Sequence, residues 1–175
     1  MKKRIAQFII KNLTSKDKRH RQVVNWNQAK LVGILFYADS EPVIHRVNQF
    51  ARDLNDQGIS TEICGYVNRK ELLDFHRKFE GIKFFSNKTV TWYGRPKDFS
   101  VNKFIAREFS ILIDLNLQER LTTKYITGRS QAHFKVGSSA NSMVDLMIAM
   151  EEKGDVDQLI IEIQKYVGIL SPSKK

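Results

Sequence analysis

The sequence has a single cysteine and no long apolar run. Because Cys64 stands alone among 175 residues, an internal disulfide is excluded, and we expect a reducing compartment, the cytoplasm. No run approaches the roughly 20 apolar residues that a membrane-spanning helix needs. The basic start, Met1 to Arg4, resembles that of a signal peptide. However, Gln7 interrupts the apolar segment 5–10 and no cleavage site follows, so we expect no export signal.

The sequence also lacks the motifs that bind common cofactors. The first expected strand is followed by Tyr-Ala-Asp-Ser-Glu rather than by the Gly-x-Gly-x-x-Gly of dinucleotide sites, and no Walker-type Gly-Lys-Ser or Gly-Lys-Thr is present. The histidines have no second ligand at metal spacing: His20, His45, His76 and His133. We therefore expect no cofactor and no metal. The lack of a recognisable nucleophile-base pair favours a protein that is not an enzyme.

Positive charge is in excess and is concentrated at one end of the chain. The formal net charge is +10, and residues 1–22 hold eight Lys or Arg against one acid, Asp17. Clustered cations indicate a polyanionic partner such as RNA, and there is no DNA-specific motif; a solubilising terminus is the simpler alternative. The candidate nucleic-acid-binding residues of this segment are Lys2, Lys3, Arg4, Lys11, Lys16, Lys18, Arg19 and Arg21.

Residues 1–22 are predicted to form a basic amphipathic arm, ahead of an α/β domain at 23–170 and a tail at 171–175. Four apolar residues of the arm recur at helical spacing between the cations: Ile5, Phe8, Ile9 and Leu13. This apolar stripe either docks on the domain or binds a partner protein. A membrane surface would need a longer apolar face.

Alternating strand and helix patterns predict the fold. Buried strands are expected at 30–38, 59–67, 82–85, 89–93, 109–116, 133–136 and 143–150, and the last of these also suits a helix. Helices are expected between 41 and 57, from 72 to 79, after Ser100, from 118 to 130 and behind a cap at Asp155. This order predicts an α/β fold with a single domain: a mostly parallel, Rossmann-like sheet of about five or six strands with helices on both faces.

The segment 109–116 is predicted to be the central strand, and Asp114 lies near its carboxyl end, where open α/β sheets bind ligands. Asp114 is therefore the candidate catalytic residue, as a base or a ribose contact. Cys64 is expected to be a core residue instead of a nucleophile. The simpler interpretation of the polar residues at this rim is that they cap helices and hold loops. They are Asp39, Ser40, Asn68, Arg69, Asp114, Asn116 and 137–139.

A second basic segment, 83–97, alternates cations with aromatic residues. Exposed aromatic rings beside cations bind single-stranded nucleic acid, through base stacking and phosphate contacts. The favoured alternative is a hairpin with its aromatics in the core and its lysines in water. The further nucleic-acid candidates from this segment are Lys88, Trp92, Arg95 and Lys97.

Three segments carry a family resemblance. Phe-Ser-Ile-Leu-Ile-Asp-Leu at 109–115, Lys-Tyr-Ile at 124–126 and Phe-Lys-Val-Gly at 134–137 resemble a family of small, uncharacterised bacterial α/β proteins, from about Leu31 to the final helix. This resemblance implies a cytosolic protein and a strand at 144–149. The same segments are loosely similar to Rossmann-like glycosyltransferase domains that use nucleotide sugars.

Three functional hypotheses follow from these patterns. The first is a non-enzymatic protein that binds RNA, or a ribonucleoprotein such as the ribosome, through the basic arm. The second is a transferase-like enzyme that acts on a phosphorylated or nucleotide-linked substrate near Asp114. The third is a protein-interaction module whose apolar stripe docks on a partner.

Overall fold

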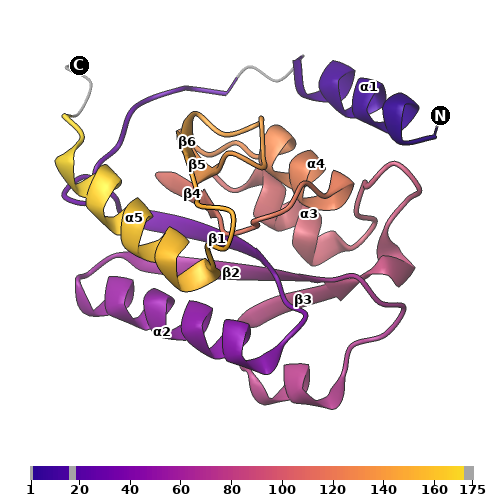
Figure 1. Cartoon of the computed structure of the whole chain (residues 1–175), viewed down its shortest axis with the longest axis horizontal. Coiled ribbons are helices and arrows are strands. Elements are labelled where there is room, and N and C mark those ends of the chain that lie inside the picture. The colour runs from indigo at the N-terminus through magenta and orange to yellow at the C-terminus, as the bar shows by residue number, and fades with distance from the viewer. Residues whose placement is uncertain (1, 16–18, 172–175) are drawn as a thin grey trace.

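The computed structural model describes residues 2–15 and 19–171 and contains one sheet of six strands (Figure 1). The strands lie in the order β3-β2-β1-β4-β5-β6, and each neighbouring pair is parallel. The predicted α/β fold with a parallel sheet of five or six strands is thereby confirmed. The strands are β1 Leu31–Tyr37, β2 Ser60–Val67, β3 Ile82–Ser86, β4 Ile111–Asp114, β5 Phe134–Ser138 and β6 Leu146–Ile148.

The strand order reverses between β1 and β4. β1 pairs with β2 on one side and with β4 on the other, so the chain builds the sheet outward in two directions. In open α/β sheets such a reversal leaves a crevice at the carboxyl ends of the two strands, and it is the usual place for a ligand. The residues after β1 and β4, including Asp39 and Asn116, lie at this edge.

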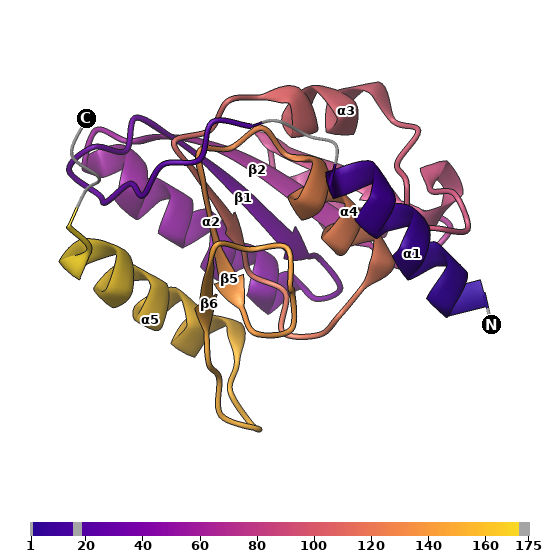
Figure 2. The same ribbon diagram turned by 90° about the horizontal axis from the view of Figure 1, so that it is seen from above.

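Helices cover both faces of the sheet, as predicted (Figures 1 and 2). Alternate residues of β1 point to opposite faces: Ile34 and Phe36 join the core under α2 and α5, and Leu35 joins the core under α3 and α4. Cys64 belongs to the second core and is fully buried, and its burial raises the pKa of the thiol far above the ordinary value. The helices are α1 Lys2–Ser15, α2 Glu41–Asp56, α3 Phe99–Ala106, α4 Leu121–Arg129 and α5 Val156–Ile169.

The N-terminal helix α1 docks on α4 instead of projecting from the domain (Figure 2). Its buried residues are Ala6 and Ile10, and Ile10 belongs to the same core cluster as Tyr125 and Ile126 of α4. The guanidinium of Arg129 donates to the carbonyl oxygen of Leu13 at 2.9 Å, across the two helices. The apolar stripe was expected either to dock on the domain or to bind a partner. The helix does dock, but through Ala6 and Ile10, which are not part of that stripe.

The prediction of an α-helix at 72–79 is wrong in both the length and the type of the helix. The structure has a short 3₁₀ helix, η1 Asp74–Lys78, in its place. The reason is the buried imidazole of His76, which bonds to the backbone N–H of Leu73 at 2.9 Å and to the carbonyl oxygen of Ala38 at 2.8 Å. These bonds fasten the segment to the end of β1, so the chain does not continue as an α-helix.

The strand predicted at 89–93 is also wrong. After β3 the chain forms a short 3₁₀ helix, η2 Asn87–Thr89, and then turns back on itself. Gly94 adopts a φ of +93°, and the N–H of Thr91 donates to the carbonyl oxygen of Arg95 at 2.9 Å. A single bridge between Val90 and Pro96 closes this turn, which leaves no ladder for a strand. The strand expected at 143–150 is present as the shorter β6.

Candidate anion-binding groove

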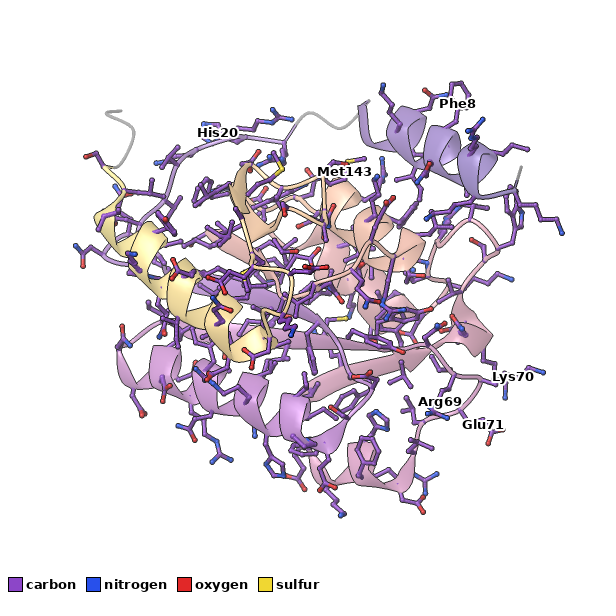
Figure 3. The ribbon with its side chains drawn as sticks, in the orientation of Figure 1. Phe8, His20, Arg69, Lys70, Glu71 and Met143 are labelled. Atoms are coloured by element: carbon purple, nitrogen blue, oxygen red, sulfur yellow. The ribbon has the colours of Figure 1, made fainter. Side chains whose placement is uncertain are left out.

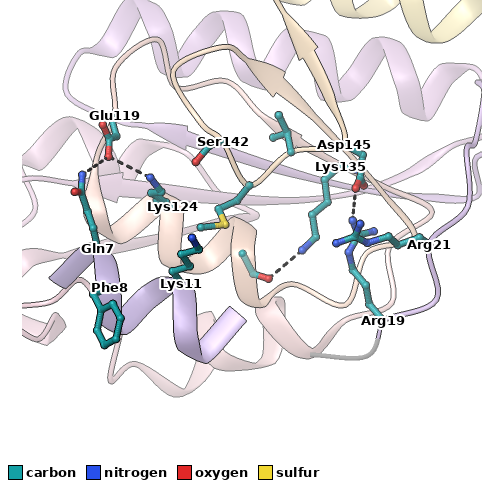
Figure 4. A pocket seen from close by; sticks show the side chains of 13 residues that line it. Gln7, Phe8, Lys11, Arg19, Arg21, Glu119, Lys124, Lys135, Ser142 and Asp145 are labelled. Carbon is teal, nitrogen blue, oxygen red and sulfur yellow. Dashed lines mark hydrogen bonds and ion pairs between the residues drawn. The ribbon is translucent and has the colours of Figure 1, made fainter. Parts of the chain in front are cut away.

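A groove of about 740 Å³ lies between α1, α4 and the segment that joins β5 to β6 (Figure 4). The docking of α1 on α4 forms two of its walls, and residues 142–145 form the third. The groove is therefore built jointly by the predicted arm and the predicted domain. Neither part alone would enclose it.

Positive side chains from four different parts of the chain line this groove. Lys11 comes from α1, Arg21 from the segment that leads to β1, Lys124 from α4 and Lys135 from β5. Lys11 and Arg21 are exposed, whereas Lys135 is buried and donates from its Nζ to the carbonyl oxygen of Gly128 at 3.1 Å. The result is a concave surface with positive charge on several sides, which suits an anionic ligand.

Sequence patterning did not single out Lys124 or Lys135. Lys124 lies on a helix that carries no other cation until Arg129, so no charge cluster marks it. Lys135 could have been recognised from the sequence, because it is a charged residue within the apolar strand segment Phe-Lys-Val-Gly. Lysine is almost never fully buried unless it is paired, so a lysine in a buried strand marks a position with a special role.

Two acidic residues also line the groove, and each is engaged by a neighbour. Glu119 accepts a hydrogen bond from the side chain of Gln7 at 2.8 Å. It also forms an ion pair with Lys124 at 3.3 Å. Partial burial acts to raise the pKa of Glu119, but these contacts and the nearby charge of Lys3 outweigh it and hold that pKa below its usual value. Glu119 therefore stays ionised and ties α1 to the start of α4.

The structure gives Arg19 a structural role. Its side chain is 5% exposed, and it forms an ion pair with Asp145 in the β5–β6 segment. The same guanidinium donates to the carbonyl oxygens of Ala132 and His133 at 2.9 and 2.8 Å. These contacts hold residues 19–22 against the start of β5 and engage the guanidinium of Arg19, which was predicted with the other arm cations to bind nucleic acid, within the protein.

The remaining arm cations lie on the outside of α1. Lys2, Lys3 and Arg4 are exposed. Lys16 and Lys18 lie outside the described residues.

The apolar stripe of the arm faces solvent, because Ala6 and Ile10 take the docked side of α1. The side chains of Ile5, Phe8 and Leu13 are 45%, 64% and 37% exposed, and Ile9 is half-buried. Phe8 lies on the outer side of the helix (Figure 3).

A second hollow adjoins the groove. It has a volume of about 470 Å³, and Glu119 lines both hollows. The turn at 89–97 forms one of its walls, and Trp92 is 59% exposed there. The other candidates of this turn are exposed as well: Lys88, Arg95 and Lys97. The aromatics of β3 behave differently, because Phe85 is buried in the core and Phe84 is half-buried.

Asp114 is at the carboxyl end of β4, as predicted, but it is buried and saturated with hydrogen bonds. One carboxylate oxygen accepts from the backbone and side-chain nitrogens of Asn116, and the other accepts from Thr127 Oγ1 at 3.0 Å and from the side chain of Asn141. Burial raises the pKa of Asp114 above its ordinary value, against these hydrogen bonds. This geometry fastens three segments together and leaves no oxygen for a substrate.

The crevice at the strand reversal is small, with a volume of about 190 Å³. Tyr37, Asp39 and Asn116 line it, and the guanidinium of Arg120 lies 3.7 Å from the centre of the Tyr37 ring, partly filling the entrance. Such a crevice is smaller than the usual ligand pocket of about 300–1,000 Å³. The rim therefore offers little room for the nucleotide-linked substrate of the transferase hypothesis.

The sequence matches the Family of unknown function (DUF6913) over residues 2–170. The chain belongs to this family. The matched range includes the residues of α1. No curated protein and no solved structure matches the chain.

No helix among residues 2–15 and 19–171 is long and apolar enough to cross a bilayer. Within the same residues, no three His, Cys, Asp or Glu side chains gather where they would hold a metal ion. The groove is lined by Lys11, Arg19 and Arg21 of the predicted arm, and the adjoining hollow is lined by Trp92 of the second basic segment.

Proposed function

We propose that the protein binds RNA, alone or within a ribonucleoprotein such as the ribosome, through the groove between α1 and α4, and that it does so without catalysis in a bacterial cytoplasm. One observation carries this proposal: docking of α1 on α4 places Lys11 of the arm around one concave surface with Arg21 and Lys124. RNA presents a regular row of phosphates, and cations grouped along a groove follow such a row by releasing counterions.

The surrounding charges support the same proposal. Lys2, Lys3 and Arg4 extend the positive surface along the exposed side of α1. The two acids of the groove are each held by a cation, Glu119 by Lys124 and Asp145 by Arg19. Their negative charges are therefore offset locally within the groove.

The test compares two variants that remove the same charge from different surfaces. The groove variant carries Lys11→Gln and Arg21→Gln in the groove and Lys3→Gln on the adjoining exposed side of α1. The control carries Arg52→Gln, Arg77→Gln and Lys153→Gln. All three control residues are exposed and lie in α2, in η1 and before α5, away from the groove. Because both variants lose three charges, any difference between them reports position and not net charge.

The measurement is fluorescence anisotropy of a labelled 20-nucleotide single-stranded RNA at several salt concentrations. Each phosphate contact contributes about 0.7 to the slope of log K against log salt for a single strand, so the groove variant should lose about 2 from that slope. The control variant should retain the wild-type slope. Equal losses in both variants, or no salt-dependent binding by the wild type, would rule out the groove as an RNA site.

Point variants serve this purpose better than removal of residues 1–22. Ile10 is part of the core, and Arg19 pairs with Asp145. Deletion of the segment would therefore expose apolar surface of α4 and release the β5–β6 segment. Lost binding in such a truncation would not distinguish a missing phosphate contact from a damaged fold.

The exposed stripe on α1 supports a second candidate, a protein-interaction module. Ile5, Phe8 and Leu13 form an apolar strip on a helix whose opposite side is already docked. The helix-in-groove mode of recognition uses anchors at this spacing. Affinity purification from the native cell separates the two candidates: a stoichiometric protein that survives nuclease, and is lost in a Phe8→Ser variant, favours this module over RNA.

A further inference from the structure

The second hollow has the features of a site for a flat polar ring. It is about 470 Å³ in volume and lies between the ends of β2 and β3, the turn at 89–97 and the start of α4. Glu119 lines both hollows, so the second hollow adjoins the groove. Its lining differs from that of the groove, with aromatic and amide side chains in place of lysines.

Trp92 is presented to this hollow by a fixed turn. The bridge between Val90 and Pro96 closes the turn, and the N–H of Gly94 donates to the carbonyl oxygen of Thr91 at 2.9 Å. A Cβ at Gly94 would lie 2.7 Å from the backbone carbon of Leu121, so the turn packs tightly against the start of α4. A tryptophan that is 59% exposed on such a support offers an apolar face that its own core does not use.

Hydrogen-bonding groups form another wall of the hollow. The hydroxyl of Tyr66 lies 3.1 Å from the side-chain oxygen of Asn68 and also contacts that of Asn87, and the side-chain nitrogen of Asn87 donates to the oxygen of Asn68. This arrangement orients the amide of Asn68. Among residues 2–15 and 19–171, no acceptor is bonded to its side-chain nitrogen, which leaves two donors for a ligand.

A cation stands between this hollow and the strand-reversal crevice. The Arg120 guanidinium is held over the Tyr37 ring at 3.7 Å. It lines both spaces and lies next in sequence to Glu119. A phosphate beside a ring bound on Trp92 would therefore lie near the positive charge of Arg120.

We propose that this hollow holds one unpaired nucleobase, stacked on Trp92, with its hydrogen-bonding edge toward Asn68 and Asn87. The inference rests on the proposed RNA binding and narrows it to single-stranded RNA. A duplex keeps its bases stacked inside the helix, whereas a single strand can turn a base outward onto an aromatic side chain. The groove then holds the phosphates and the hollow holds a base.

The test uses Trp92→Ala, with Trp92→Phe as a matched variant that keeps an aromatic face. Binding of a 12-nucleotide single-stranded RNA and of a 12-base-pair RNA duplex is measured at one salt concentration. Trp92→Ala should weaken single-strand binding about tenfold and leave duplex binding within twofold, and Trp92→Phe should lose less. Circular dichroism confirms the fold of each variant, which should not change because Trp92 is largely exposed.

Intrinsic fluorescence gives an independent measurement. The chain has two tryptophans, and Trp26 is held away from this hollow by a bond from its Nε1 to the carbonyl oxygen of Gln164 at 2.9 Å. The difference between wild-type and Trp92→Phe emission therefore reports Trp92. Stacking should quench this difference signal on addition of single-stranded RNA.

The outcomes separate this inference from the proposed function. If the groove variant loses salt-dependent RNA binding while Trp92→Ala binds single strands as the wild type does, the base site is overturned and the groove remains. An unquenched Trp92 signal at saturating RNA overturns it as well. If the wild type binds no RNA at all, both proposals fall together.

Discussion

At the scale of single residues, Asp114 shows how a carboxylate at a sheet edge can be structural. Its two oxygens accept hydrogen bonds from three side chains and one backbone N–H, which come from the β4 end, from α4 and from the segment after β5. Burial raises its pKa above the unfolded value of about 3.9. The contribution of this raised pKa to the free energy of unfolding is therefore fully present below about pH 3.9. It is lost as the pH rises through the pKa of Asp114 in the folded protein.

We expect Asp114→Ala to lower the free energy of unfolding by about 3 kcal/mol. The substitution leaves Thr127, Asn141 and Asn116 with buried donors that have lost their acceptor, and each such group costs about 1–3 kcal/mol before relaxation. Urea unfolding followed by circular dichroism at pH 7 measures the change. The matched control is Asp39→Ala, which removes an exposed carboxylate at the same edge and should change stability by less than about 0.5 kcal/mol. Equal stabilities of the two variants would contradict the structural role.

The sequence predicted where Asp114 lies but not what surrounds it. A strand that ends in Asp is visible as an apolar run, and the position at the sheet edge follows from the parallel topology. Its partners Thr127 and Asn141 lie 13 and 27 residues further along the chain. No local pattern connects residues so far apart, so the choice between a catalytic and a structural carboxylate required the tertiary structure.

At the scale of secondary-structure elements, close packing in the centre of the sheet depends on Gly33 of β1. A Cβ at this position would lie 2.7 Å from the ring of Phe109, which is fully buried and packs on Phe104 with ring centres 4.8 Å apart. Neither ring has room to retreat, because both belong to the core under α3 and α4. The helices on this face therefore approach β1 as closely as they do because β1 has a glycine there.

We expect Gly33→Ala to destabilise the protein by about 1–3 kcal/mol, the usual cost of overpacking a core. Gly168→Ala in α5 should act in the opposite direction. Its Cβ would meet nothing nearer than 3.7 Å, and alanine in a helix gains about 0.5 kcal/mol over glycine. Thermal unfolding of the two variants measures whether each substitution raises or lowers the stability of the protein. A stabilised Gly33→Ala protein would show that Phe109 has room to move.

Strongly periodic elements were predictable, and elements set by single tertiary contacts were not. β1 and α5 have strong apolar patterns. The bounds of β1 were predicted to within one residue, and α5 begins directly after its predicted cap, Asp155. The segment 72–79 has a helical pattern too, but the hydrogen bonds of His76 to the end of β1 override it. The aromatic pattern at 89–93 resembles a strand, yet Gly94 and Pro96 turn the chain back before a strand can pair.

At the scale of the whole molecule, the arm and the domain form one unit. The helix and its cations were predictable from spacing and composition, but its docked side was not. The apolar residues of α1 lie on two sides: Ala6 and Ile10 face α4, and Ile5, Phe8 and Leu13 face solvent. The sequence marked the longer apolar stripe of the helix, but the structure buries the shorter side formed by Ala6 and Ile10. The groove depends on α1 docking through this shorter side.

Docking of α1 should depend on the ionised carboxylate of Glu119, which bonds Gln7 across the two helices. The pKa of Glu119 is lowered in the folded protein. Its contribution to the stability of the docked helix is therefore fully present above the unfolded pKa of about 4.3, and it is lost as the pH falls through the folded pKa. We therefore expect amide hydrogen exchange in α1, corrected for intrinsic rates, to speed up as the pH falls from 5 to 3. Exchange in β1 and β4 should change much less over the same range.

The variant Glu119→Ala should reproduce this loosening at neutral pH. Loss of one such hydrogen bond is worth about 0.5–1.5 kcal/mol, so exchange in residues 2–13 should rise about twofold to tenfold. Glu108→Ala is the control, because Glu108 is equally exposed and lies before β4, away from α1. The variant should also lose the extra acid sensitivity of α1. If α1 exchanges at the wild-type rate in Glu119→Ala at both pH values, Ile10 and the Arg129 bond to Leu13 hold the helix alone, and the groove keeps its shape without Glu119.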